Sequence, residues 1–158
     1  MRRRAAILLA LLCVLAWPAA ALAHPDGTPR PHRHLTHALV FRWPALGAIT
    51  TRFSSRHDGI DIGSLRSLSI RAAYPGRVLH VGYTSGFEGY GNIVDVEIAP
   101  GVETLYAHLS AEAVHVGQHV RRGQRLGTAG CTGLCYGTHL HFEVREHGIP
   151  VNPLRFLH

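Results

Sequence analysis

The chain has 158 residues, which is enough for one domain with its own hydrophobic core and too few for several. All 16 basic residues are arginine, and they stand against ten acidic residues and 13 histidines. Basic runs interleaved with aromatic residues are absent, so the composition excludes a typical nucleic-acid-binding surface.

The first 23 residues have the three parts of a secretory signal peptide. The basic start MRRR precedes the apolar run AAILLALLCVLAW, and the small residues ALA end the segment. The apolar run is shorter than the about 20 residues that a membrane-spanning helix needs. We therefore predict cleavage after Ala23 and a secreted, extracytoplasmic chain without a stable membrane span. Three arginines leave with the signal, so 13 basic residues face ten acidic ones in the remaining chain.

Residues 24–39 are rich in proline, histidine and polar side chains and show no periodicity, which is typical of an extended arm. The four histidines of this arm could bind a metal ion, but nothing in the sequence fixes their geometry. We expect a solvated arm, followed by a single domain at residues 40–158 that is monomeric.

The domain reads as short strands separated by turns. Apolar and polar residues alternate in GRVLHVGY and NIVDVEIA, and Pro100 and Gly101 join the second stretch to VETLYAHL as a hairpin. Seventeen glycines, and no long amphipathic helical pattern, predict a mostly β, antiparallel sandwich or barrel in one domain. The expected strands lie at 49–53, 59–63, 76–83, 92–99 and 102–109, within 119–130, and at 138–145.

Two cysteines, Cys131 and Cys135, remain after removal of the signal. In an exported protein such a pair favours a disulfide. Two thiolates could instead form half of a zinc ribbon, but that site needs a second ligand pair of similar spacing, which the sequence lacks. We predict a disulfide that stiffens the turn before His139.

The stretch GTHLHFEV, residues 137–144, places two histidines side by side on an expected strand. Because side chains alternate along a strand, His139, His141 and Glu143 share one face, and three apolar residues share the other. A His-x-His pair on a strand is often an ordinary polar face. Glu143 could accept a hydrogen bond from a ligand imidazole, but we expect an ordinary surface glutamate.

A second pattern, RHDGIDIG, places His57 and Asp61 four residues apart. Imidazole and carboxylate are both ligands of tetrahedral zinc. Two ligands from this segment and one from a distant strand would leave the fourth position open, as in catalytic zinc sites. His108, in YAHLS at the end of a strand, adds a further imidazole. The helical HExxH motif is absent, which excludes zincin-type proteases.

The motifs HDGID, YAHLS and GTHLHFEV occur in this order, and GRVLHVG, GYGNIVDV and VGQHVRRGQRLGTAG connect them. Together they resemble the M23 family of zinc metallopeptidases, the lysostaphin-like or LytM-like peptidoglycan endopeptidases. The resemblance covers nearly all of residues 47–155. The turn before HLH departs from the pattern, because it carries two cysteines where the family is commonly rich in serine, threonine and glycine.

The resemblance implies a metal site and a catalytic pair in a groove on one sheet. One Zn²⁺ ion would be bound by His57, Asp61 and His141, and His108 and His139 would be the unligated catalytic histidines. The implied activity is hydrolysis of peptide bonds in the stems or cross-bridges of bacterial peptidoglycan, by an enzyme associated with the cell wall.

Two other functions compete with this interpretation. Some members of the family have lost ligands and act as non-catalytic regulators or activators of other wall hydrolases, whereas all five site positions are present here. The stretch VGQHVRRGQRLG also resembles the hairpin of lipoyl or biotinyl carrier domains. Those domains need a lysine for attachment, and this chain has none.

Overall fold

The computed structural model describes residues 39–158 of the chain. Between these residues the regular structure is ten strands and one 3-10 turn. In chain order the elements are β1 (Ala48–Thr51), β2 (Ile60–Gly63), β3 (Ser69–Arg71), β4 (Gly76–Tyr83), β5 (Asn92–Ala99), β6 (Val102–Glu112), β7 (His119–Val120), β8 (Arg125–Ala129), β9 (Leu140–Glu146), β10 (Ile149–Val151) and η2 (Pro153–Arg155). Within this part of the chain, no helix has the length and apolar character needed to cross a membrane.

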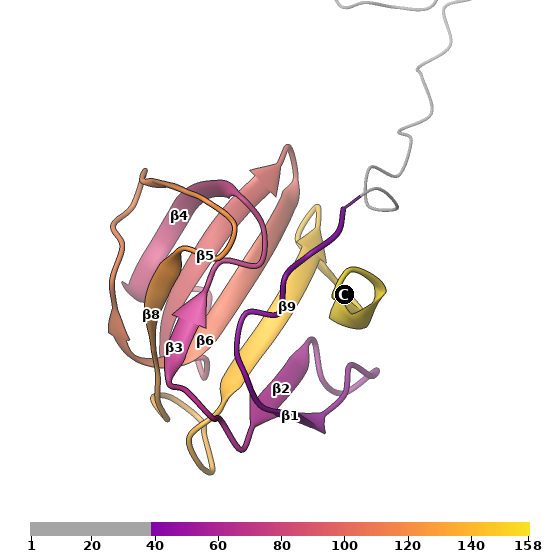
Figure 1. The fold of residues 1–158 in the computed structure, drawn as a ribbon, viewed down its shortest axis with the longest axis vertical. Helices are drawn as coiled ribbons and strands as arrows, with labels where there is room; N and C mark the ends of the chain where they lie inside the picture. The colour runs from indigo at the N-terminus through magenta and orange to yellow at the C-terminus, as the bar shows by residue number, and fades with distance from the viewer. Residues whose placement is uncertain (1–38) are drawn as a thin grey trace, which may run out of the picture. The chain divides into compact units, whose positions relative to one another are not determined.

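The strands form an antiparallel sheet in the order β1-β2-β9-β6-β5-β4-β7, with β10 beside β9. The long strand β6 pairs with β9 along its first half and with β8 along its second half, and β8 also pairs with β3. In Figure 1, β3 and β8 lie across one face of β5 and β6, and the two layers share one hydrophobic core. The prediction of a mostly β, antiparallel single domain is confirmed.

The strand bounds follow the alternation in the sequence. Both β4 and β5 coincide with the predicted stretches 76–83 and 92–99, and the turn after β5 contains Gly101 at a φ of 72°, a region that favours glycine. Strand β3 was not predicted. It has three residues, of which only Ile70 is buried, so it is too short for alternation to be visible.

Strand β9 carries the apolar face that the sequence predicts. Leu140, Phe142 and Val144 are fully buried in the core, and the Phe142 ring lies 5.2 Å from that of Tyr106. Each such side chain stabilises the fold by about 1.5–3 kcal/mol through removal of apolar surface from water. Because these residues hold the strand against the core, the direction of the opposite face is fixed.

The predicted signal peptide, residues 1–23, and the arm residues 24–38 lie outside the described residues. At the start of the predicted domain, the Phe41 backbone N–H donates to the Phe156 carbonyl at 2.8 Å, and the two rings stack at 5.2 Å. The first described residues are thereby attached to the C-terminal segment.

A buried carboxylate lies on β5, away from the predicted site residues. Asp95 is 2% exposed, its Oδ2 accepts a hydrogen bond from His80 Nδ1 at 3.1 Å, and its Oδ1 has no hydrogen-bond partner among residues 39–158. Burial raises the pKa of Asp95 to about 6, because it penalises the charged form more than the His80 hydrogen bond favours it.

We predict that Asp95→Asn changes how stability depends on pH. A carboxyl whose pKa is raised on folding stabilises the protein fully below its unfolded pKa, about 4, and loses that contribution as the pH rises through 6. The free energy of unfolding of the unmodified protein, minus that of the variant, should fall by about 2 kcal/mol between pH 4 and pH 7. Urea titrations at a series of pH values measure this difference, and a flat difference would contradict the assignment.

Candidate metal centre and active site

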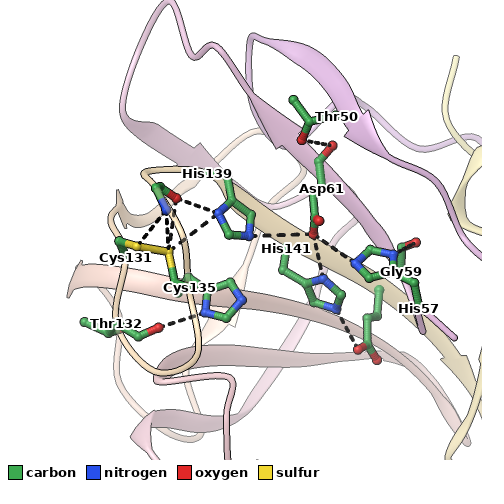
Figure 2. Close-up of polar contacts among 12 residues, drawn as sticks. Thr50, His57, Gly59, Asp61, Cys131, Thr132, Cys135, His139 and His141 are labelled. Atoms are coloured by element: carbon green, nitrogen blue, oxygen red, sulfur yellow. Dashed lines mark hydrogen bonds and ion pairs between the residues drawn. A yellow bond between two sulfur atoms is a disulfide. The ribbon is translucent and has the colours of Figure 1, made fainter.

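The pairing of β2 with β9 brings the two predicted ligand motifs together. Asp61 lies directly across from His141 in the register of the two strands. Its Oδ1 is 2.9 Å from His141 Nδ1 and 3.2 Å from His57 Nε2. Figure 2 marks both contacts. The three donor atoms lie within 4.8 Å of one another. The structure therefore forms a His/Asp/His group capable of holding a metal ion.

A glycine turn makes this convergence possible. His57 precedes β2, and its Nδ1–H donates to the Gly59 carbonyl at 2.9 Å, which turns Nε2 toward Asp61. A Cβ at Gly59 would collide with the carbonyl oxygen of Phe142 on the neighbouring strand. The glycine in HDGID is thus required by the close approach of this turn to β9.

Glu143 is not the surface residue that we predicted. It is fully buried, and its Oε1 accepts a hydrogen bond from His141 Nε2 at 2.8 Å. The Tyr90 hydroxyl donates to Oε1 at 2.7 Å, and Arg145 Nε donates to Oε2 at 2.6 Å. Alternation placed Glu143 on the correct face, but it could not show that Tyr90, from the segment between β4 and β5, reaches this carboxylate.

These contacts set the charges around His141. Burial by itself raises the pKa of Glu143, but the hydrogen bonds from His141, Arg145 and Tyr90 outweigh burial and hold the pKa below its usual value. Burial by itself lowers the pKa of His141, but the hydrogen bonds to Asp61 and Glu143 raise it to about 9. The same histidine helps to hold the pKa of Asp61 well below its usual range, against the effect of burial. A cation, either a proton or a metal ion, is therefore favoured between these carboxylates.

The donor set fits zinc. A carbonyl or carboxylate oxygen only accepts hydrogen bonds, so His57 carries its proton on Nδ1 and His141 carries one on Nε2. When both imidazoles are neutral, the lone pairs of His57 Nε2 and His141 Nδ1 point at Asp61 Oδ1. A metal ion bound by all three atoms would remove the repulsion between these lone pairs. Two ligands of one tetrahedral zinc lie about 3.3 Å apart, close to the observed separations of 2.9 and 3.2 Å.

The two predicted catalytic histidines lie beside this group. The rings of His108 and His139 are 4.8 Å apart, and His139 Nε2 is 3.7 Å from Asp61 Oδ1. His139 precedes the first residue of β9 and forms an isolated bridge with Gly130. His108 has a φ of 61°, which is uncommon for a residue with a side chain and recurs at functional sites.

His108 is suited to act as a neutral base. It is 7% exposed, and burial lowers its pKa, an effect only partly opposed by the hydrogen bond to the Thr132 carbonyl. That hydrogen bond, 2.8 Å long, places the proton on Nδ1. The Nε2 nitrogen is then free to accept a proton at neutral pH.

All five predicted site residues line one cavity of about 650 Å³. Its wall also includes residues from three connecting segments. Tyr136 is fully exposed and Leu134 is 81% exposed, so the rim presents apolar side chains to solvent. The further lining residues include Thr50, Thr51, Ser64, Glu88, Gly89 and Tyr90.

The segment before His139 is closed by a covalent bond. Cys131 and Cys135 form a disulfide with their Cα atoms 5.3 Å apart. Figure 2 places this disulfide next to His139, and Cys135 Sγ lies 3.7 Å from His139 Nδ1.

Comparison with known proteins identifies the family. The family model described as Peptidase family M23 matches residues 55–153. The chain belongs to peptidase family M23. The murein hydrolase activator NlpD of Escherichia coli is 37% identical over 125 residues, which are 77% of this chain and 32% of NlpD.

Two further relatives bear on the chemistry of this M23 domain. The DD-carboxypeptidase/endopeptidase Mpg of Neisseria meningitidis is 45% identical over 98 residues, which are 62% of this chain and 22% of Mpg. The crystal structure of a zinc containing peptidase from Vibrio cholerae superposes with a TM-score of 0.62 at 28% identity, over 72% of this chain and 39% of that one. The chain thus matches about a third of NlpD and about a fifth of Mpg in length.

We predict that Glu143→Gln weakens zinc binding by this M23 domain by about ten- to a hundredfold, because the His141 ring loses its carboxylate partner. Competition with a chromophoric chelator measures the affinity. Glu146→Gln, near the far end of the same strand, is the matched control and should bind zinc like the unmodified protein. Equal affinities for all three proteins would refute a role of Glu143 in holding His141.

Proposed function

We propose that the protein is an exported zinc metalloendopeptidase that cleaves peptide bonds in the stems or cross-bridges of bacterial peptidoglycan. The observation that carries this proposal is the convergence of His57, Asp61 and His141 beside His108 and His139 in one cavity. Three protein ligands with a fourth position left open are the pattern of catalytic zinc sites, whereas structural sites use four.

The proposed mechanism divides the work between the metal and the two unligated histidines. A zinc ion held by His57, Asp61 and His141 would supply Lewis-acid activation of a water molecule and of the peptide carbonyl. His108 and His139 both carry their proton on Nδ1, which leaves each Nε2 available. At these atoms the chain can accept the proton of the water, donate to the developing oxyanion, and return a proton to the leaving amine.

The names of the relatives support the substrate and the location. NlpD is named a murein hydrolase activator and Mpg a DD-carboxypeptidase/endopeptidase. The predicted signal peptide, residues 1–23, directs the chain to the compartment where peptidoglycan lies. We propose that the protein acts there as a monomer associated with the cell wall.

A second function has specific support. The similarity to NlpD favours a regulator that keeps its zinc and activates other wall hydrolases without cleaving peptides itself. The two functions differ in what the catalytic histidines do. In an enzyme, loss of these histidines abolishes peptide cleavage. In a regulator, their loss leaves the activation of other wall hydrolases unchanged.

We predict that His141→Ala and His139→Ala fail in different ways. His141→Ala should lose most of the bound zinc, because it removes a ligand. His139→Ala should keep the zinc and lose hydrolysis, because it removes only a group that handles protons. Metal analysis of the purified proteins, together with rates of peptide cleavage, separates the two effects. Equal loss of zinc in both variants would overturn this division of roles.

Digestion of purified peptidoglycan sacculi tests the proposal as a whole. The zinc-loaded protein is expected to release fragments with new peptide termini, and His139→Ala should release none. Mass spectrometry of the fragments identifies the bond that is cut. The zinc-loaded protein, with or without residues 24–39, could instead cleave none of several types of peptidoglycan and yet stimulate a separate wall hydrolase. That result would show that the protein is a regulator.

A further inference from the structure

One short loop contacts both unligated histidines. The segment 131–137, whose residues 131–135 the disulfide closes into a ring, provides the carbonyl of Thr132 to His108 Nδ1 at 2.8 Å and the carbonyl of Gly137 to His139 Nδ1 at 2.7 Å. We propose that this loop is a positioning element that holds both imidazoles in the Nδ1–H tautomer, with Nε2 directed toward the cavity. Its catalytic consequence rests on the proposed function, whereas its effect on the two rings does not.

The hold on His139 depends on the disulfide. The Gly137 backbone N–H is 3.2 Å from Cys131 Sγ and 3.5 Å from Cys135 Sγ, and the carbonyl of the same residue accepts from His139. Cys135 Sγ also lies 3.0 Å from the Gly137 carbonyl oxygen, so among the described residues the disulfide contacts both the N–H and the C=O of Gly137. The disulfide therefore fixes the acceptor that fixes the His139 ring (Figure 2).

The hold on His108 depends on a side chain instead. Thr132 Oγ1 donates to the Leu109 carbonyl at 2.9 Å and accepts from the Asn92 backbone N–H at 2.9 Å. Both partners belong to strands of the central sheet, β6 and β5. The Thr132 carbonyl that accepts from His108 is thus fastened to the sheet by bonds that do not involve the disulfide.

The two histidines should therefore respond to different substitutions in the loop. Loss of the disulfide should release Gly137 and with it His139, while Thr132 continues to hold His108. Loss of the Thr132 hydroxyl should release His108 and leave His139 in place. A ring without its carbonyl acceptor exchanges between the Nδ1–H and Nε2–H tautomers, and the second form presents a proton where the mechanism needs a lone pair.

Imidazole nitrogen NMR of the zinc-loaded protein tests this directly, at about pH 8, above the usual imidazole pKa. The unmodified protein should show Nδ1–H signals for both histidines. Cys131→Ser/Cys135→Ser should shift His139 to a mixture of tautomers and leave His108 unchanged, and Thr132→Val should do the reverse. Intact mass, lower by about 2 Da when the bridge is present, verifies the state of the cysteines.

Zinc content and kinetics complete the test. The zinc ligands lie outside the loop, so both variants should retain the metal and the dispersed amide spectrum of the folded sheet. In the double serine variant, kcat should fall by about ten- to a hundredfold with little change in KM, because a misplaced proton-transfer group slows the reaction without weakening binding. If that variant does not fold, reversible reduction of the unmodified protein, followed by reoxidation, makes the same comparison.

The outcomes separate the two proposals. Unchanged His139 signals without the disulfide, or equal changes of both histidines in both variants, would overturn the positioning role. Protein that shows the expected tautomer shifts but cleaves no peptidoglycan would leave the positioning role intact and reject the enzyme.

Discussion

The structure of the site depends on the antiparallel pairing of β2 with β9. This register sets Asp61 opposite His141, and the turn at Gly59 brings His57 to the same carboxylate oxygen. The lone pairs of two neutral imidazoles then face a carboxylate, an arrangement that needs a cation. Burial of Leu140 and its apolar neighbours holds β9 in this register, because a shift by one residue would turn His141 into the core.

The second constraint is the charge buried next to the metal-binding group. A carboxylate without solvent, such as that of Glu143, is costly unless its oxygens are hydrogen-bonded. Here His141, Arg145 and Tyr90 all donate to it, and the guanidinium of Arg145 lies 5.1 Å from the centre of the Phe87 ring. The segment between β4 and β5 therefore contributes Tyr90 to this hydrogen-bond network, which links the fold of that segment to the orientation of His141.

The strands and the loop 131–137 contact different residues of the site. Strands β2 and β9, with the turn before β2, position the residues that can bind a metal ion, while the loop 131–137 contacts His108 and His139, the proposed proton-transfer groups. In this chain the loop beside His139 carries a disulfide, and Tyr136 and Leu134 on its outer edge are exposed at the rim.

The sequence by itself determined what depends on local periodicity. The alternation of β9 placed His139, His141 and Glu143 on one face, the hairpin at Gly101 joined β5 to β6, and the ordered motifs identified five of the residues that line the cavity. Only the tertiary structure decided that Glu143 is buried, that β3 exists, and that Thr132 and Gly137 hold the free histidines. Except for the contact of Gly137 with His139, two residues away, those features arise from contacts between residues far apart in the chain, such as Tyr90 with Glu143. No local pattern encodes such long-range contacts.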